Sequence, residues 1–172
     1  GNSCKMSFLG KVKKKLRNGS WYPFYNTFYE KNNLDPHMIL LESRSGKALE
    51  SNILSLLKEL CQEPYCGFTL VLSVHRDSEN EIKEKLQKNS IQGVHFVRTG
   101  SVAYYRALSR AGYLVNDTSF PGRFIKKEGQ IYLNTWHGTP LKKMGRDNRP
   151  EMVTMGNVQR NLLDSDYLVF PN

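Results

Sequence analysis

A histidine and a glycine stand between a strand pattern and a helix start in the stretch YLNTWHGTPLKKMG, residues 132–145. Residues 131–136 are rich in β-branched and aromatic side chains, which favours a strand. Thr139 followed by Pro140 predicts a helix start, because threonine accepts bonds from the first N–H groups and proline is tolerated at the first helical position. The pattern therefore predicts His137 on a tight turn at the carboxyl end of a strand, facing the positive end of a helix.

This turn has the groups that acid–base chemistry on an anionic substrate needs. His137 can take a proton near neutral pH, since the reference pKa of histidine is about 6.5. Gly138 lets a substrate approach the backbone, and Thr139 and the helix dipole offer donors to an anion. Lys142 and Lys143 add positive charge. A single histidine in a turn carries limited weight, so the spacing makes His137 a candidate base and Gly138, Thr139 and Lys142 candidate binding residues.

A second polar stretch, SRSGK at residues 43–47, partly resembles a phosphate-binding loop. It lacks the first glycine of the G-x-x-x-x-G-K-[ST] motif and has Ala48 where Ser or Thr would bind magnesium, which argues against an ATPase. Gly46 and Lys47 could still hold one phosphate at a helix N-terminus, and the alternative is an ordinary loop between a strand and a helix. The remaining predicted substrate-binding residues also follow predicted strands: Glu42, Asn116 and Asp117.

The other histidines and the cysteines predict no metal centre. None of them has a second histidine or cysteine at the spacing of metal ligands. We expect His37 and His95 to be structural, whereas His75, at a strand end beside Arg76 and Asp77, could line a pocket. We therefore predict no metal and no cofactor.

The chain is basic, with 25 Lys and Arg against 16 Asp and Glu and a formal net charge of +9. Such a charge favours anionic partners. Basic and apolar residues alternate near helical spacing before the aromatic cluster of residues 21–29, which is typical of an anchor on an anionic membrane surface. The alternative is a solvated helix whose apolar edge packs on the domain. The predicted membrane-surface residues are Lys11, Lys13, Lys14, Lys15, Arg17 and Trp21.

Two other classes of partner or location are disfavoured. The sequence has no zinc finger, ribonucleoprotein sheet motif or KH loop, so we expect no nucleic-acid partner. No segment approaches the run of about 20 apolar residues that a membrane-spanning helix needs.

Strand and helix patterns alternate after Pro36. Strands are predicted at residues 38–41, 68–74, 94–97, 113–115, 131–136 and 167–170, and helices at residues 49–60, 78–87, 101–110 and 151–163. The predicted fold class is α/β, a Rossmann-like parallel sheet with helices on both faces and ligand loops at the strand ends. We expect a basic N-terminal segment at residues 1–35 and a Rossmann-like domain at residues 36–172, truncated at the seam with a further domain.

Four segments resemble those of the CDP-glycerol glycerophosphotransferases of teichoic-acid and capsule synthesis. TWHGTPLKKMG resembles the family's His-Gly-Thr-Pro motif, and ILLESRSGKALESNI its upstream Glu-Ser-x-x-Gly-Lys segment. NDTSFPGRFIKKEGQIYLNTWHGT is similar in order and spacing to the approach to that motif, and SDYLVFPN resembles the segment that follows it. The resemblance covers residues 38–172, and the His-Gly-Thr-Pro portion is the most specific part.

The resemblance implies a two-domain GT-B architecture, of which this chain would be the N-terminal, acceptor-side half. It implies transfer of glycerol phosphate, or another polyol phosphate, from a CDP-activated donor such as CDP-glycerol to a lipid-linked acceptor, with His137 as general base. It also implies a peripheral protein at the cytoplasmic face of the membrane. Because the family's donor domain would follow Asn172, we expect this chain alone to be inactive.

Two alternatives remain open at this point. One is a non-catalytic α/β module that binds an anionic polymer. The other is a GT-B sugar transferase that uses a different nucleotide donor.

Overall fold

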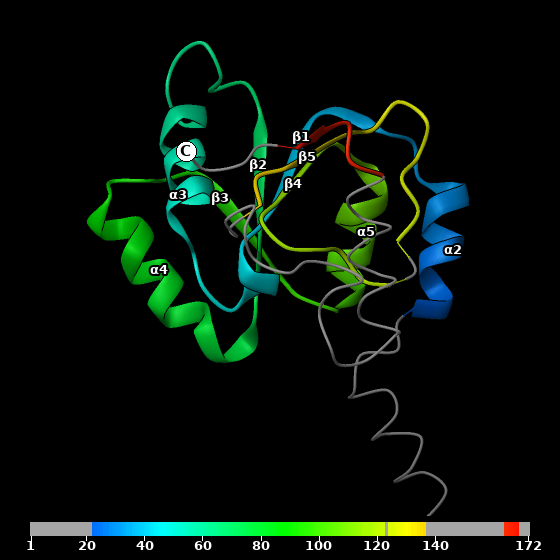
Figure 1. The fold of residues 1–172 in the computed structure, drawn as a ribbon, viewed down its shortest axis with the longest axis horizontal. Helices are drawn as coiled ribbons and strands as arrows, with labels where there is room; N and C mark the ends of the chain where they lie inside the picture. Colours follow the sequence, from blue (N-terminus) through cyan, green and yellow to red (C-terminus); the bar gives the residue numbers. More distant parts are fainter. Residues whose placement is uncertain (1–21, 123, 137–163, 169–172) are drawn as a thin grey trace, which may run out of the picture.

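The computed structural model describes residues 22–122, 124–136 and 164–168, which form a parallel sheet between two layers of helices (Figure 1). The strands are β1 (Asp35–Glu42), β2 (Thr69–Val74), β3 (Val94–Arg98), β4 (Ala111–Asn116), β5 (Ile131–Asn134) and β6 (Tyr167–Leu168). The helices are α2 (Tyr22–Lys31), α3 (Ser51–Leu60), α4 (Glu79–Lys88) and α5 (Val102–Arg110). Two short 3-10 turns, η1 (Arg44–Gly46) and η2 (Arg76–Ser78), follow β1 and β2.

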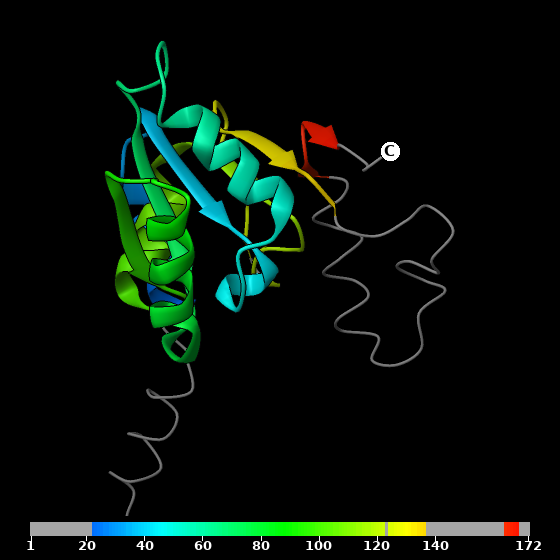
Figure 2. The ribbon, with the colours of Figure 1, turned by 90° about the vertical axis from the view of Figure 1, so that its left-hand side faces the viewer.

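The strand order is β3-β2-β1-β4-β5-β6, and every neighbouring pair is parallel. The chain starts in the middle, moves outward to β3, and then returns across β1 to β4. Parallel crossovers are right-handed, so a reversal of direction carries the connecting helices to the opposite face. Accordingly α3 and α4 cover one face, and α5 with α2 covers the other (Figures 1 and 2). The predicted α/β fold class, with helices on both faces of a parallel sheet, is confirmed.

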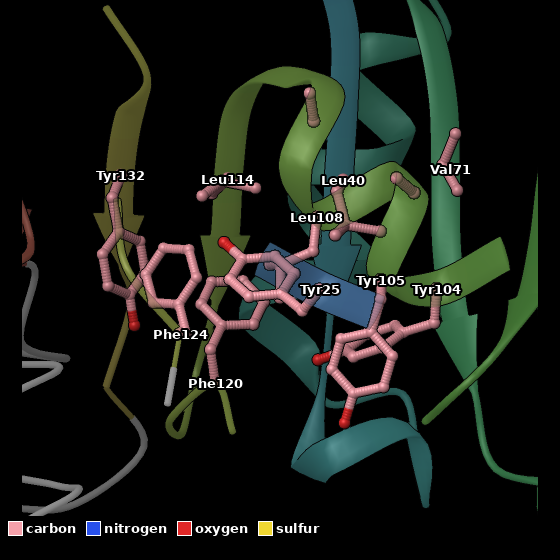
Figure 3. Packing of buried hydrophobic residues seen from close by; sticks show 12 residues of the cluster. Tyr25, Leu40, Val71, Tyr104, Tyr105, Leu108, Leu114, Phe120, Phe124 and Tyr132 are labelled. Atoms are coloured by element: carbon pink, nitrogen blue, oxygen red, sulfur yellow. The ribbon is translucent and has the colours of Figure 1, made fainter. Parts of the chain in front are cut away.

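Each face of the sheet has its own apolar core because alternate strand residues point to opposite faces. On β1, Leu40 packs with α5 and α2, whereas Ile39 and Leu41 pack with α3 and α4. The core beneath α3 and α4 is mainly aliphatic. The core beneath α5 and α2 is largely aromatic, as Figure 3 shows, and includes Tyr25, Tyr104, Tyr105, Phe120, Phe124 and Tyr132.

The strand boundaries differ from the sequence-based expectation at two places that matter. β1 begins at Asp35, three residues early, because Asp35 pairs with Ala111 at the start of β4. β5 ends at Asn134, two residues early, because the Asn134 side chain accepts a bond from Trp136 N at 3.0 Å. The predicted helix at residues 151–163 lies outside the described residues.

The aromatic part of the N-terminal segment is built into the fold. Tyr25 on α2 is 1% exposed and donates a hydrogen bond from its hydroxyl to Ile125 O at 3.0 Å. Phe28 and Tyr29 pack against the same core, so the packing alternative holds for these three aromatic residues. The residues predicted at a membrane surface, Lys11, Lys13, Lys14, Lys15, Arg17 and Trp21, lie outside the described residues. The division at residue 35 stays a prediction.

Within the described part of the chain, no helix is both long enough and apolar enough to cross a bilayer.

Candidate functional site

The carboxyl ends of four neighbouring strands carry a row of buried polar residues. The strand register pairs Ser73 with Glu42, Glu42 with Asn116, and Asn116 with Asn134. All four are at most 1% exposed. They lie two residues beyond core residues such as Leu40 and therefore share the sheet face covered by α5. The centre of the row lies between β1 and β4, where the strand order reverses, which is where open α/β sheets bind their ligands.

Glu42 is the most perturbed acid of the row. The pKa of its carboxyl is raised to about 7, chiefly by burial and slightly by the nearby charge of Asp117, against hydrogen bonds with Ser73 and Tyr104, which lower it. Even so, Glu42 Oε2 has no hydrogen-bond partner of good geometry among the described residues. Glu42 therefore changes its protonation state near neutral pH inside a closed environment.

Tyr104 faces Glu42 from α5, the helix that covers this face of the sheet. It lies in the first turn of α5, whose N-cap Ser101 accepts a bond from Tyr104 N at 3.2 Å. Its side chain is fully buried, and burial together with Glu42 holds its pKa well above the usual range. Figure 3 shows the hydroxyls of Tyr104 and Tyr132 on the side of the aromatic core where the strand arrows end.

A hydrogen-bonded network joins the ends of β4 and β5. The Tyr132 hydroxyl donates to Asn116 Oδ1 at 2.8 Å and accepts from Asn134 Nδ2 at 3.2 Å. Asn134 Nδ2 also donates to Thr118 O at 2.9 Å. Burial raises the pKa of Tyr132, so its hydroxyl keeps its proton and stays a donor. The network fixes the point at which the chain leaves β5.

The residues after β5 are held across the end of β4. Thr135 N donates to Asn116 O at 2.8 Å, and Asn52 Nδ2 of α3 donates to Thr135 O at 3.1 Å. Asn116 ends β4, and Asn52 lies on α3, the helix that follows β1. The two bonds therefore hold Thr135 close to the β1–β4 reversal. The His-Gly-Thr-Pro segment begins directly after Trp136. His137, Gly138, Thr139 and Lys142 themselves lie outside the described residues.

Asp117 has a structural role that the sequence did not reveal. Its carboxylate accepts from Ser43 Oγ at 2.7 Å and from Arg44 N at 2.8 Å, while Ser43 Oγ accepts from Glu50 N at 2.9 Å. Asp117 thereby fastens the loop after β1, and the residue before α3, to the end of β4. Its predicted role in substrate binding stays a prediction.

The predicted phosphate site at Gly46 and Lys47 is corrected in its geometry. Both backbone N–H groups are already used, Gly46 N by Ser43 O at 2.8 Å and Lys47 N by Arg44 O at 3.1 Å. The two residues also precede the start of α3 at Ser51, so they are not at a helix N-terminus. Gly46 is buried at a φ of 78°, where a Cβ atom would lie 2.2 Å from Thr99 Oγ1. Only glycine fits this close approach, and the exposed Lys47 side chain remains a binding candidate.

The three other histidines are not members of the buried row. His75 N-caps η2, and its Nδ1 accepts weakly from Asp77 N at 3.4 Å. His95 is exposed on the edge strand β3, and His37 contacts the Phe68 ring at a centroid distance of 6.0 Å. The described residues contain no group of three His, Cys, Asp or Glu side chains that could hold a metal ion.

Several members of the buried row were not predicted from the sequence. Ser73, Tyr104, Tyr132 and Asn134 were assigned only to strands and a helix. The signal that could have found them is a polar residue at the inward position where a strand alternation ends, as in the segments LVLS and IYLN. Tyr104 gives no such signal, because an aromatic residue on a helix is ordinarily part of a core.

A hollow of about 420 Å³ lies on the other sheet face and does not touch the polar row. It is lined mainly by apolar side chains, among them Leu56, Leu60, Phe68 and Leu133. Its chemistry suits packing rather than acid–base work.

Comparison with known proteins identifies the family. A family model described as CDP-Glycerol:Poly(glycerophosphate) glycerophosphotransferase matches residues 24–172. The chain belongs to this family. The resemblance inferred from the His-Gly-Thr-Pro segment is therefore confirmed.

Relatives in this glycerophosphotransferase family act in teichoic acid synthesis. The chain is 30% identical over 155 residues to the teichoic acid poly(glycerol phosphate) polymerase of Staphylococcus epidermidis, covering 86% of this chain and 20% of that protein. It is 28% identical over 170 residues to the teichoic acid glycerol-phosphate transferase of Staphylococcus aureus, covering 94% of this chain and 41% of that protein.

A solved structure shares both fold and sequence with the chain. A variant of the wall teichoic acid polymerase TagF soaked with CDPG matches with a TM-score of 0.69 and 28% identity, over 95% of this chain and 40% of that one. The chain thus spans well under half the length of these proteins.

Proposed function

We propose that this chain is the acceptor-side part of an enzyme that transfers glycerol phosphate from CDP-glycerol to a growing teichoic-acid chain. Family membership and the similarity to teichoic acid polymerases support the reaction class. The observation that carries the local assignment is the anchoring of Thr135 to Asn116 and Asn52, two residues before His137 in the sequence.

In the proposed reaction, His137 removes the proton from an acceptor hydroxyl. The hydroxyl oxygen attacks the β-phosphorus of CDP-glycerol in line, a new P–O bond forms, and the bond to the bridging oxygen breaks, so that CMP leaves with the electron pair. Thr139 and Lys142 would stabilise negative charge on the transferred phosphate. Such transfers are accelerated mainly by positioning and charge stabilisation.

The donor nucleotide would bind to a part of the enzyme beyond residues 1–172. The relatives are two to five times longer than the stretch matched here, which leaves room for a second domain. The basic residues Lys11, Lys13, Lys14, Lys15 and Arg17, with Trp21, would hold the protein at the cytoplasmic membrane face, near a lipid-linked acceptor.

A donor comparison tests the proposed function. A full-length transferase that contains this chain is incubated with an acceptor and, separately, with CDP-glycerol, CDP-ribitol or a UDP-sugar, and the released nucleotide is identified. We expect CMP release with CDP-glycerol and chain growth by glycerol phosphate. UDP release with transfer of a sugar would favour a GT-B sugar transferase, and no turnover with any donor would favour a non-catalytic polymer-binding module.

A further inference from the structure

Thr135, the residue that directly follows β5, is held by bonds from two different elements. Its N–H donates to Asn116 O at the end of β4 at 2.8 Å, and its carbonyl accepts from Asn52 Nδ2 of α3 at 3.1 Å. Thr135 is also buried, with 7% of its surface exposed. A buried residue whose N–H and carbonyl are both bonded has little freedom to shift or rotate. Thr135 is therefore a fixed point of the chain just before His137.

Asn52 can hold this carbonyl firmly because the start of α3 is itself fastened to the sheet. Asn52 is the second residue of α3. Glu50 N, just before the helix, donates to Ser43 Oγ at 2.9 Å, and Ser43 Oγ donates to the Asp117 carboxylate at 2.7 Å. One residue after Asn52, Ile53 is fully buried in the aliphatic core beneath α3. The Asn52 amide therefore joins an anchored helix to the chain that leaves β5.

The position of Thr135 limits where the proposed base can lie. His137 follows Thr135 by two residues, and two residues of extended chain span at most about 7 Å. A displacement of about 1 Å in a catalytic group can lower a rate about 100-fold. Of the two bonds to the Thr135 backbone, the one from Asn116 uses a backbone carbonyl and the one from Asn52 uses a side chain. Asn52 is therefore the partner that a substitution can remove.

We propose that Asn52 is a positioning residue: by holding the Thr135 carbonyl, it keeps His137 where it can take the proton of the acceptor hydroxyl. This inference rests on the proposed function, in which His137 is the base. In this role Asn52 touches neither a substrate nor the reacting atoms. Its contribution is therefore made in the transition state, through the base, and not in the binding of either substrate.

Steady-state kinetics of a full-length transferase that contains this chain test the positioning role. Asn52→Ala should lower kcat about tenfold, while the KM values for the acceptor and for CDP-glycerol stay within about twofold. Asn52→Asp keeps the size of the side chain but replaces the Nδ2 donor with an acceptor oxygen, so it should lower kcat at least as much. The matched control is Asn89→Ala, which removes an asparagine amide that donates to Lys85 O at 2.7 Å at the end of α4 and should leave kcat unchanged.

A second background separates positioning from a general role in the fold. In His137→Ala, where no base is left to position, Asn52→Ala should lower the residual turnover by less than about twofold. A tenfold loss in both backgrounds would show that Asn52 does not act through His137. Unchanged kcat in Asn52→Ala, or a raised acceptor KM in its place, would also overturn the positioning role. Absence of transfer by the unmodified enzyme, or full turnover in His137→Ala, would instead contradict the proposed function itself.

Discussion

A single carboxyl, that of Glu42, determines much of the electrostatics at the reversal between β1 and β4. It is buried beside Tyr104 of α5, Asp117 after β4 and, farther away, Tyr132 of β5, none of which carries a positive charge. Because no cation among the described residues offsets burial, the carboxyl takes up a proton far more readily than an exposed glutamate. The raised pKa of Glu42 therefore makes the stability of the fold depend on pH.

The pKa of Glu42 predicts a pH-dependent loss of stability. In the folded protein the pKa is about 7, against a reference value of 4.5, so the folded state binds more protons between these pH values and its stability falls as pH rises through this window. Glu42→Gln removes the effect. We expect the free energy of unfolding of the variant, relative to the unmodified protein, to rise by up to about 3 kcal/mol between pH 5 and pH 8.

Urea unfolding at several pH values measures this difference, and the other titrating groups cancel because both proteins share them. Parallel pH profiles for the two proteins would show that Glu42 is ionised at an ordinary pKa and accessible to water.

Asp117 predicts a second residue-scale result. Asp117→Ala removes the acceptor of Ser43 Oγ and Arg44 N, and should lower the free energy of unfolding by about 2–4 kcal/mol, as expected for two bonds to a buried carboxylate. Asp77→Ala, at a side chain that is 83% exposed, serves as control and should change stability little. Equal denaturation midpoints for the two variants would show that the hydrogen bonds of Asp117 to Ser43 and Arg44 do not stabilise the fold.

At the scale of elements, α2 decides how much of the N-terminal segment belongs to the fold. The Tyr25 ring lies 5.9 Å from the Tyr105 ring of α5, centroid to centroid. Tyr25→Ala should therefore lower the free energy of unfolding by about 3–5 kcal/mol, the usual cost of truncating a buried aromatic residue. Tyr65→Ala, at a residue that is 40% exposed, should cost much less. A Tyr25→Ala variant as stable as the unmodified protein would mean that α2 does not pack on the domain.

The helices and strands were easier to predict from the sequence than the buried polar row. Apolar runs between turn residues predicted the strands at residues 38–41, 68–74 and 94–97. The alternation of these strands with helices predicted the parallel sheet. What the sequence could not give was the register. Only register shows that Ser73, Glu42, Asn116 and Asn134 form one row, because each of them looks alone like an ordinary strand end.

The aromatic residues show the opposite limit. Tyr25 and Phe28 follow a basic stretch, and composition alone cannot distinguish a ring that faces a membrane from one that packs on α5. Likewise Gly46 looked like a phosphate-loop glycine, whereas its conformation serves the close approach of Thr99 and His75.

At the scale of the whole molecule, the net charge of +9 favours binding to an anionic membrane surface. Because α2 is part of the core, the proposed anchor is now confined to residues 1–21. Attraction of about 1 kcal/mol per basic residue near an anionic bilayer predicts binding that weakens as salt rises. Sedimentation with phosphatidylserine vesicles should remove the full chain from solution at low salt but not a chain that starts at residue 22. Vesicles of neutral lipid are the control, and equal sedimentation of both chains would contradict the anchor.

The proposed function requires that His137, which follows the anchored residue Thr135 by two positions, supplies the base for phosphoryl transfer. The most direct measurement is CMP release from CDP-glycerol by a full-length transferase that contains this chain, in the presence of acceptor. His137→Ala should lower turnover about 100-fold or more, the usual effect of losing a general base, while His95→Ala, at an exposed edge-strand histidine, should leave it nearly unchanged. Unchanged turnover in His137→Ala, or an equal loss in both variants, would contradict the role of His137 as general base.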